Sequence, residues 1–481
     1  MAFDHPSAGR LRPFIGGEIH TCDGAAHTLS RPQDGKAIGD LIETDAAVLD
    51  QAVASARGAF QVHRTATANE RAGWLRASAG ALHEAQDRIA EIIALDIGKP
   101  IRAARFEAGR GVGLLEACAA AALDLGGDVV PLDAAPVPGT RFGFTRRVPF
   151  GVVAAITPFN APVNLVLQKV GPALAAGNAV VVKPAPSGTR VTLALAELMT
   201  GAGLPSGMMN VVTGDREAAS ALAAHADVDA VSFTGGTQAG DALVRAAGAK
   251  KFAAELGSNA ANIVMADADL DQAATKIAGA AFEASGQQCI SAQRVLVERS
   301  VFDLFLPLFE AAAAAMRVGP IEDPATDIGP MVSRAAAKRV MAMVDDAIES
   351  GARVVLAPRR EGCVVSPGVL TDVPRDAWLW QEEVFGPIAI VASVEDVDDA
   401  LRQANDSPFG LQGAVFTRSL DTAFRFSDAF EVGSLWINEA SRFRLDMYPF
   451  GGVKRSGFGR EGVRYAIEEL SQLKFTGINL Q

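Results

Sequence analysis

Short apolar runs, separated by turns and helical stretches, recur between residues 151 and 255 and constrain the fold more than any other feature. They read as buried strands, over residues 151–156, 179–183, 210–212, 230–233 and 251–255. Helices are predicted between them up to about residue 176, over 192–199 and from 237. Strands that are apolar on both faces and alternate with helices indicate a mostly parallel sheet covered on both sides. Ligands of such sheets lie beyond the carboxyl ends of the strands.

Polar residues and glycines follow three of these runs. Asn160 comes after the first run, Lys183 closes the second, and Gly235, Gly236 and Thr237 follow the fourth. A side-chain amide can donate a hydrogen bond to a developing oxyanion, and glycines let a helix N-terminus approach a phosphate closely. Each signal alone is weak, because an asparagine can cap a helix and a lysine can be a solvated charge. Together, at one sheet edge, they indicate a dinucleotide site.

A carboxylate and a thiol frame the next stretch of the chain. Glu255 ends the fifth run, and Cys289 follows a predicted strand over 262–265 and a predicted helix over 269–284. A thiolate is the strongest common side-chain nucleophile, and a carboxylate can take a proton from it or from water in a dry site. The alternative is a cysteine packed as a small hydrophobe and a solvated glutamate. The strand-end residues nearby favour covalent catalysis.

Composition and charge narrow the function classes. The chain has 481 residues, enough for two or three domains, and its formal net charge of −12 disfavours nucleic-acid and anionic-membrane partners. Its apolar runs are too short to span a bilayer and residues 1–5 carry no signal pattern, so we expect a cytoplasmic protein. The four cysteines lie far apart, which indicates reduced thiols and no metal site.

The remaining segments are read more coarsely. Residues 1–45 are rich in turn formers, and 45–125 show the apolar spacing of helices. In a helix predicted over 102–122, the glycine-rich run 109–113 lacks the preceding strand of a dinucleotide fingerprint and indicates close helix packing. Residues 127–148 read as two extended segments that would protrude or pair with another chain. A second α/β region is predicted, with strands over 294–297, 353–356, 388–391, 410–417 and 433–438, a helix over 302–316, a loop over 439–448 and a last strand over 471–477.

A set of motifs, in order along nearly the whole chain, resembles the aldehyde dehydrogenase superfamily. They are Thr157-Pro158-Phe159-Asn160, Lys183-Pro184-Ala185-Pro186, Phe233-Thr234-Gly235-Gly236-Thr237, Glu255-Leu256-Gly257, Gly286-Gln287-Gln288-Cys289, Glu382-Glu383-Val384-Phe385-Gly386-Pro387 and Pro449-Phe450-Gly451-Gly452. The resemblance implies oxidation of an aldehyde to the carboxylic acid with NAD or NADP.

The resemblance implies a role for each of four catalytic residues. Cys289 would attack the aldehyde carbon to give a thiohemiacetal and then a thioester, and Asn160, with the backbone amide of Cys289, would hold the oxyanion. Glu255 would activate the water that hydrolyses the thioester, and Lys169 would lie near the active site. A glutamate at position 255 favours this hydrolytic branch over the branch that transfers the acyl group to coenzyme A.

The resemblance also implies a cofactor site. Lys183 would contact the adenosine ribose, and Glu383 with Phe385 would position the nicotinamide ribose. NAD-preferring members often carry a ribose-binding glutamate where this chain has Pro186, and Ser187 could donate a hydrogen bond to a 2′-phosphate, so both NAD and NADP stay open. The predicted cofactor residues are Ile156, Thr157, Pro158, Phe159, Lys183, Ala185, Pro186, Ser187, Phe233, Gly235, Gly236, Thr237, Leu256, Gly257, Glu383 and Phe385.

Two arginines in the 439–448 loop, Arg442 and Arg444, suggest a small polar or anionic aldehyde, because guanidinium is a natural anion clamp. The alternative is that Arg444 pairs with Asp446 and only shapes the loop. The motifs are most similar to the lactaldehyde, glycolaldehyde and phosphonoacetaldehyde dehydrogenase group, although Ala161 and Gln288 stand where a histidine and an arginine are expected for a phosphonate. The predicted substrate residues are Arg110, Gln288, Ile290, Arg442, Arg444 and Phe450.

The implied architecture is α/β, with a Rossmann-like dinucleotide-binding domain, a second α/β catalytic domain and a small β oligomerisation extension. The predicted boundaries are 1–126 with 149–257, then 258–460, and 127–148 with 466–481. The extension implies a homodimer or homotetramer.

Three rival functions remain at this point. A Cys-Glu-Lys amide or nitrile hydrolase would use Cys289, Glu255 and Lys169 without a nucleotide. A semialdehyde dehydrogenase that acylates coenzyme A would share the fold, and a catalytically idle relative would keep the fold alone. The joint presence of Asn160, Glu255 and Cys289 disfavours the idle relative.

Overall fold

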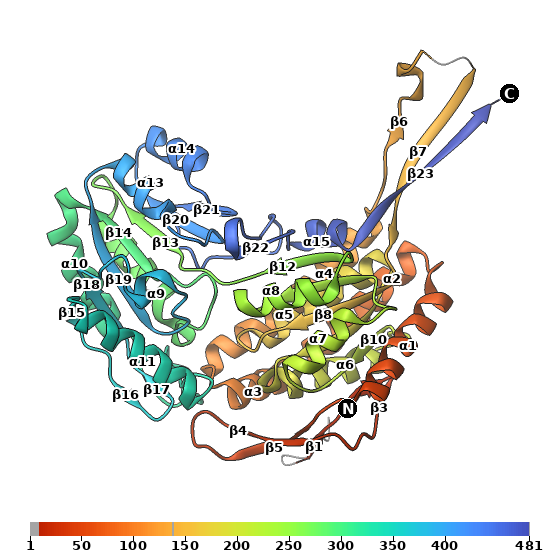
Figure 1. Ribbon diagram of the computed structural model, residues 1–481, viewed down its shortest axis with the longest axis horizontal. Coiled ribbons are helices and arrows are strands. Elements are labelled where there is room, and N and C mark those ends of the chain that lie inside the picture. Colours follow the sequence, from red (N-terminus) through yellow and green to blue (C-terminus); the bar gives the residue numbers. More distant parts are fainter. Residues whose placement is uncertain (1–8, 137–138, 481) are drawn as a thin grey trace.

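Two α/β bodies and a protruding arm make up the computed structural model, which describes residues 9–136 and 139–480 (Figure 1). Residues 1–8, which include the stretch without a signal pattern, lie outside the described residues, as do 137–138 of the extension and 481. The predicted α/β fold with a β extension is confirmed. The domain boundaries stay a prediction. Within the described residues, no helix has the length and apolarity needed to cross a bilayer.

The first body is built on an eight-stranded sheet. Its order is β22 (Gly457–Phe458), β12 (Lys251–Glu255), β11 (Ala230–Thr234), β8 (Val152–Thr157), β9 (Ala179–Pro184), β10 (Met209–Val211), β2 (Phe14–Ile15) and β3 (Glu18–Ile19). The five predicted strands, from β12 to β10, form its parallel centre as expected. Short antiparallel strands extend both edges of the sheet. Each has only two residues, too few to show the alternating pattern by which a strand is predicted from sequence.

Helices pack against this sheet and bury its apolar faces (Figure 1). Those that contact its strands are α1 (Ala46–His63), α5 (Pro162–Ala176), α6 (Thr189–Gly201), α7 (Arg216–Ala224) and α8 (Thr237–Ala247). The others pack mainly on α5, α6 or one another, and are α2 (Ala68–Glu84), α3 (Gln86–Ile97), α4 (Ile101–Leu123) and α15 (Val463–Glu469). A Cβ at Gly111 of α4 would lie 2.8 Å from Val163 and 3.1 Å from Leu167, both on α5. The interpretation of this glycine run as close helix packing is therefore confirmed at Gly111.

The second body contains a seven-stranded sheet with apolar cores on its two faces. Its order is β15 (Arg353–Leu356), β18 (Gly368–Thr371), β19 (Ile388–Val394), β14 (Arg294–Glu298), β13 (Ala261–Val264), β20 (Gln412–Phe416) and β21 (Ser434–Ile437). Its helices are α9 (Leu270–Phe282), α10 (Arg299–Ala314), α11 (Arg334–Glu349), α12 (Trp378–Gln381), α13 (Val397–Asn405) and α14 (Leu420–Ala429). The predicted strands here are confirmed, whereas β18, α11, α12, α13 and α14 were not predicted.

Smaller elements complete the fold. They are the sheet of β1 (Arg10–Leu11), β5 (Ala37–Ile42) and β4 (Ala26–Ser30), the hairpin of β16 (Arg360–Glu361) and β17 (Val364–Val365), and the 3-10 turns η1 (Leu132–Ala134), η2 (Pro186–Gly188), η3 (Glu283–Gly286) and η4 (Lys454–Ser456).

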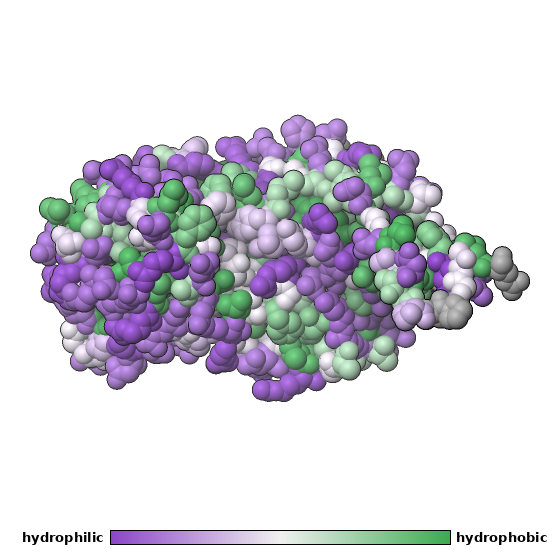
Figure 2. All heavy atoms as spheres, turned by 90° about the horizontal axis from the view of Figure 1, so that it is seen from above, coloured by the Kyte–Doolittle hydropathy of each residue, from purple (hydrophilic) through white to green (hydrophobic). Residues whose placement is uncertain are grey.

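The arm is a three-stranded sheet in the order β23 (Ser471–Leu480), β7 (Thr140–Pro149) and β6 (Val129–Val130). The extended segments predicted within 127–148 are present, but β6 covers only two residues of β7. The main partner of β7 is β23, which pairs with it along ten residues, from Ser471 against Pro149 to Leu480 against Thr140. Figure 2 shows hydrophobic side chains along this arm, which projects from the rest of the molecule.

Candidate active site

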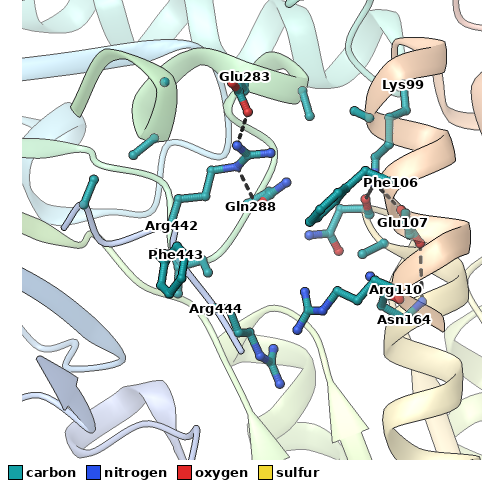
Figure 3. Close-up of a pocket in the computed structure, with 18 of the residues that line it drawn as sticks. Lys99, Phe106, Glu107, Arg110, Asn164, Glu283, Gln288, Arg442, Phe443 and Arg444 are labelled. Atoms are coloured by element: carbon teal, nitrogen blue, oxygen red, sulfur yellow. Dashed lines mark hydrogen bonds and ion pairs between the residues drawn. The ribbon is translucent and has the colours of Figure 1, made fainter. Parts of the chain in front are cut away.

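A cavity of about 850 Å³ is lined by residues of both bodies. Cys289 and Asn160 both border it, although they come from different bodies. Side chains of α4, α5 and α9 and of the 439–445 loop form most of its wall, and Figure 3 shows the charged ones around the space. The fold therefore brings together Cys289, the predicted nucleophile, and Asn160, the predicted oxyanion ligand.

A sharp turn delivers Cys289 to the cavity. The helix predicted over 269–284 ends earlier, at Phe282, because Ala284 and Ser285 have left-handed backbone, with φ of 52° and 61°. A Cβ at Gly286 would lie 2.3 Å from the Gly386 carbonyl oxygen, so this position requires glycine. Cys289 itself is half-buried.

Apolar neighbours surround the Cys289 sulfur on the protein side. Ile290, Leu411 and Phe450 are buried and pack with Cys289 and Tyr448. Burial raises the pKa of the Cys289 thiol to about 12, and the nearby charge of Glu383 acts in the same direction. The resting side chain is therefore a neutral thiol, and attack on a carbonyl requires removal of its proton.

Asn160 lies in the turn between β8 and α5 and is buried. Within the described residues its side-chain amide has no hydrogen-bond partner, while its backbone carbonyl accepts a bond from Lys99 Nζ at 2.6 Å. The amide is thus available to donate to an oxygen in the cavity.

Glu255 ends β12 and is buried, with Oε2 making no hydrogen bond in the described residues. Burial raises the pKa of Glu255 well above the usual value, and the charge of Glu461 raises it further, against Arg444 and Lys169. The Glu255 charge in turn raises the pKa of the Cys289 thiol. A carboxylate with a raised pKa binds a proton more readily and is a stronger base.

Glu461 gathers two cations beside Glu255 and was missed by sequence reasoning. Its carboxylate accepts bonds from Lys169 Nζ at 2.9 Å and from Arg444 at 2.7 Å. Burial opposes ionisation of Glu461, but Lys169 and Arg444 outweigh it and lower the pKa of Glu461 to about 2. Lys169, predicted near the active site, is therefore engaged by Glu461. No motif contains Glu461, so only the folded chain reveals it.

The predicted alternative pairing of Arg444 is wrong. Arg444 pairs with Glu461, and its guanidinium carbon lies 3.7 Å from the centre of the Phe450 ring. Asp446 instead accepts two bonds from Arg110, at 2.9 and 2.7 Å, and one from Gln168 at 3.0 Å. The loop directs Arg444 toward Glu461 and Asp446 toward Arg110 of α4 and Gln168 of α5, so these two neighbouring charges do not meet.

Arg442 has looser partners. It binds Glu283 and donates to Gln288 at 3.1 Å (Figure 3). The Glu283 side chain is 38% exposed, whereas Glu461 and Asp446 are 8% and 13% exposed. Compared with Arg110 and Arg444, Arg442 is thus the arginine whose carboxylate partner can most easily turn to solvent.

The predicted cofactor residues gather at the carboxyl ends of the parallel strands. Ile156 to Phe159 end or follow β8, Lys183 to Ser187 end or follow β9, and Phe233 to Thr237 and Leu256 to Gly257 do the same for β11 and β12. Glu383 and Phe385 approach from the second body, since the Glu383 carboxylate accepts a bond from the Ser258 amide at 3.1 Å and Phe385 packs on Phe159.

Two orphaned polar groups at this edge fit a polar ligand. Lys183 is buried and has no partner among the described residues, and Thr157 Oγ1 is buried without a hydrogen bond there. Burial lowers the pKa of Lys183 to about 8, against the raising effect of Asp215 and Glu217. Beside Ser258, burial raises the pKa of Glu383 to about 7. The described residues include no cluster of His, Cys, Asp or Glu that could hold a metal ion.

The chain belongs to the aldehyde dehydrogenase family, whose profile matches residues 21–476. It is 42% identical over 433 residues to 3-sulfolactaldehyde dehydrogenase of Priestia aryabhattai, covering 90% of each chain. It also resembles the NADP-dependent glyceraldehyde-3-phosphate dehydrogenase of Bacillus halodurans C-125 complexed with NADP, at a TM-score of 0.95 and 33% identity over 98% of this chain and 99% of that one. An NAD-dependent aldehyde dehydrogenase from Sinorhizobium meliloti matches at a TM-score of 0.94 and 32% identity, covering 99% and 97%.

The protein is thus an NAD(P)-dependent aldehyde dehydrogenase that oxidises aldehydes to carboxylic acids. Its cofactor is NAD or NADP. The resemblance drawn from the motifs is confirmed, and an amide or nitrile hydrolase is not supported.

Proposed function

We propose that Cys289 is the nucleophile, that Asn160 and the Cys289 backbone amide hold the oxyanion, and that Glu255 activates the hydrolytic water. The supporting observation is that the half-buried sulfur and the unpartnered amide border one cavity. A bound nicotinamide supplies the hydride acceptor for this chemistry. Because the Cys289 thiol has a raised pKa and Glu255 does too, the carboxylate is suited to take protons, first from the thiol and later from water.

Glu461 would keep the pKa of Glu255, the proposed proton acceptor, raised. It holds Lys169 and Arg444 in ion pairs, so neither cation can neutralise Glu255 fully. Since the pKa of Glu461 is lowered to about 2, it remains charged throughout the neutral range and keeps the pKa of Glu255 high.

The strand-end residues would hold the cofactor. Lys183 would bind the adenosine ribose, Gly235, Gly236 and Thr237 would lie near the phosphates at the start of α8, and Glu383 would accept hydrogen bonds from the nicotinamide ribose. This assignment is supported by the unpartnered Lys183 and by the helix that begins at Thr237.

The substrate would be a small polar aldehyde, and an anionic one above all. Arg110, Arg442 and Arg444 border the cavity, and their guanidinium groups favour a carboxylate, phosphate or sulfonate. The relative from Priestia is named for a sulfonated aldehyde and the enzyme from Bacillus for a phosphorylated one. Arg442 is the proposed anion ligand, because its present partner Glu283 is the most exposed of the three carboxylates.

A panel of matched aldehydes tests this function. Each pair shares a chain length and differs by an anionic group, such as acetaldehyde with sulfoacetaldehyde and butanal with succinic semialdehyde, and reduced nicotinamide absorbance is followed with NAD and with NADP. The anionic member should have a kcat/KM about tenfold higher or more, the factor of one charge-assisted hydrogen bond. Preference for the neutral member would contradict the proposed substrate class.

Two variants sharpen the panel. Cys289→Ala should abolish turnover of every aldehyde, and unchanged turnover would overturn the proposed chemistry. Arg442→Met should raise KM about tenfold for the anionic member alone. Arg353→Met removes another arginine paired with a carboxylate, on the surface, and should change neither constant.

We also propose a homodimer or homotetramer assembled through the arm. Support comes from apolar side chains on its last strand, such as Leu473 and Phe475, which are 58% and 51% exposed. Exposed apolar groups on an edge strand favour pairing with another chain.

A further inference from the structure

We propose that the buried pair of Lys99 and Glu107 positions Asn160 for catalysis, and that these two are positioning residues. The inference rests on the proposed oxyanion-holding role of Asn160. Neither residue belongs to one of the sequence motifs to which the reaction was assigned.

Lys99 and Glu107 contact both the turn that carries Asn160 and the start of α5, which follows it. Lys99 Nζ donates to the Asn160 carbonyl at 2.6 Å. It also donates to the Glu107 carboxylate, and Figure 3 shows Lys99 and Glu107 side by side. Glu107 Oε1 accepts from the backbone amides of Val163 at 2.8 Å and Asn164 at 3.4 Å. The carbonyl of Asn160 and the first amides of α5 are therefore fixed by one ion pair.

Glu107 satisfies a helix that lacks a side-chain cap of its own. α5 begins at Pro162, and Ala161 before it makes no capping hydrogen bond. Free amides at a helix N-terminus favour a negative charge, which Glu107 supplies from α4. The orientation of α5 relative to Asn160 thus depends on a side chain outside the turn.

Burial of the pair argues for a role beyond stability. The Lys99 and Glu107 side chains are 7% and 3% exposed. The desolvation of a buried ion pair offsets most of its attraction, so an apolar pair of similar size could stabilise the fold as well. What an apolar pair could not do is hold one carbonyl and two amides in fixed directions.

The loop that presents Lys99 packs closely against residues of the second body. Gly98 has φ of 76°, and a Cβ there would lie 2.6 Å from Pro330 Cγ in the second body. The Ile101 amide donates to the Ile321 carbonyl at 2.8 Å. Lys99 therefore sits on a loop fixed against the second body, so the position of Asn160 is tied to the body that carries Cys289.

Lys99 also borders the cavity and could be read as a substrate ligand. Two of its three N–H groups are already used by Glu107 and Asn160. The two readings predict different kinetics: a ligand changes KM for anionic aldehydes only, whereas a positioning residue changes kcat for neutral aldehydes as well.

A double-mutant cycle with Asn160 tests the inference. The variants are Lys99→Met, Asn160→Ala and the double variant, assayed with a neutral aldehyde and with a saturating cofactor. Lys99→Met should lower kcat about 10- to 100-fold, with KM within about twofold, because a displaced amide no longer meets the oxyanion. In the Asn160→Ala background the same change should cost less than about twofold.

Controls separate positioning from folding. Lys99→Met leaves the buried Glu107 carboxylate without its cation, so we expect a lower thermal transition, and kcat is compared at a temperature at which both proteins are folded. At that temperature, alkylation of Cys289 by iodoacetamide should stay near wild type in Lys99→Met. Arg105→Met removes an exposed cation of α4, the helix that carries Glu107, where it is paired with Asp87, and should leave kcat unchanged. Glu107→Gln is isosteric and keeps an acceptor for the α5 amides, so it provides the same cycle if Lys99→Met fails to fold.

The outcomes divide cleanly. An equal loss from Lys99→Met with and without Asn160, an effect on KM for anionic aldehydes alone, or an unchanged kcat would each overturn the positioning role. If Asn160→Ala alone leaves kcat unchanged, the proposed role of Asn160 fails first. If instead Asn160→Ala lowers kcat and Lys99→Met does not, the role of Asn160 stands and the positioning role of Lys99 is overturned.

Discussion

The environment of Cys289 sets how the residue reacts before substrate arrives. Cys289 packs against Ile290 and Phe450, no described residue donates a hydrogen bond to its sulfur, and burial raises the pKa of the thiol to about 12. Only the thiolate is alkylated, so its fraction, and the reaction rate, should rise about tenfold per pH unit below that pKa. We expect iodoacetamide labelling of Cys289 in the free enzyme to climb from pH 7 to pH 10 without a plateau.

Mass spectrometry of the labelled peptide measures this rate. The other cysteines, Cys22, Cys118 and Cys363, are buried and provide internal references. A plateau near pH 8 would show a stabilised thiolate and contradict the neutral resting state.

Glu461 should control the acid limb of the pH profile. Its charge raises the pKa of Glu255, and it also occupies Lys169 and Arg444, which lower that pKa. Glu461→Gln removes the first effect and frees the second, so the pKa of Glu255 falls. Because the proposed mechanism needs ionised Glu255, the acid limb of kcat against pH should move to lower pH by about one unit.

A pH profile at saturating aldehyde checks this shift. Glu395→Gln removes a surface carboxylate paired with Arg299 and should not move the limb. A shift to higher pH would mean that another group controls the limb.

The residues of the site were predictable to different degrees. Asn160 and Lys183 follow strands of one parallel sheet, and the carboxyl ends of such strands meet at one edge, so their grouping follows from chain order. The partner of Arg444 does not. Asp446 is nearer in sequence than Glu461, yet the pairing depends on how the loop folds back onto α5, which no local pattern encodes.

At the scale of elements, Arg294 ties a strand to the end of a helix. Its guanidinium donates to the carbonyls of Asn259 at 2.9 Å, Gln403 at 3.1 Å and Ala404 at 3.0 Å, the last two at the C-terminal end of α13. Arg294→Met would leave these buried acceptors unsatisfied, which costs about 3 kcal/mol or more. We expect a lower thermal transition by calorimetry.

The surface variant Arg353→Met is the matched comparison, because this arginine also begins a strand but is 60% exposed and pairs with Asp372. Equal transitions in the two variants would show that the carbonyls at α13 find other donors.

Elements formed by local periodicity were predicted well, and elements formed by distant partners were not. The apolar runs of β8, β9 and β11 are buried on both faces and carry their own signal. β22 has two residues and exists only because it pairs with β12, far earlier in the chain. The helix before Cys289 was predicted too long, because the left-handed backbone of Ala284 and Ser285 has no composition that marks it.

For the whole molecule, the arm should decide the state of assembly. Leu473 and Phe475 lie two residues apart on β23, an edge strand, and so point to the same side of the arm. Changing both to aspartate places charges in the proposed contact. We expect a smaller species by sedimentation velocity than for the wild-type protein.

Lys474 lies between them and points to the other side, so Lys474→Ala provides the control. The same sedimentation coefficient in the double aspartate variant would exclude this side of the arm as the contact between subunits.

The late strand β22 has a consequence for synthesis of the chain. It covers the open side of β12, the strand that ends in Glu255, and joins its sheet through residues 457 and 458. The ribosome therefore adds residue 255 long before it adds the strand that covers β12. Until then, the backbone amides and carbonyls on this edge of β12 can pair with a strand of another chain. Nascent chains arrested between these points should bind chaperones that capture exposed sheet edges, and release should come only once residue 458 has left the exit tunnel.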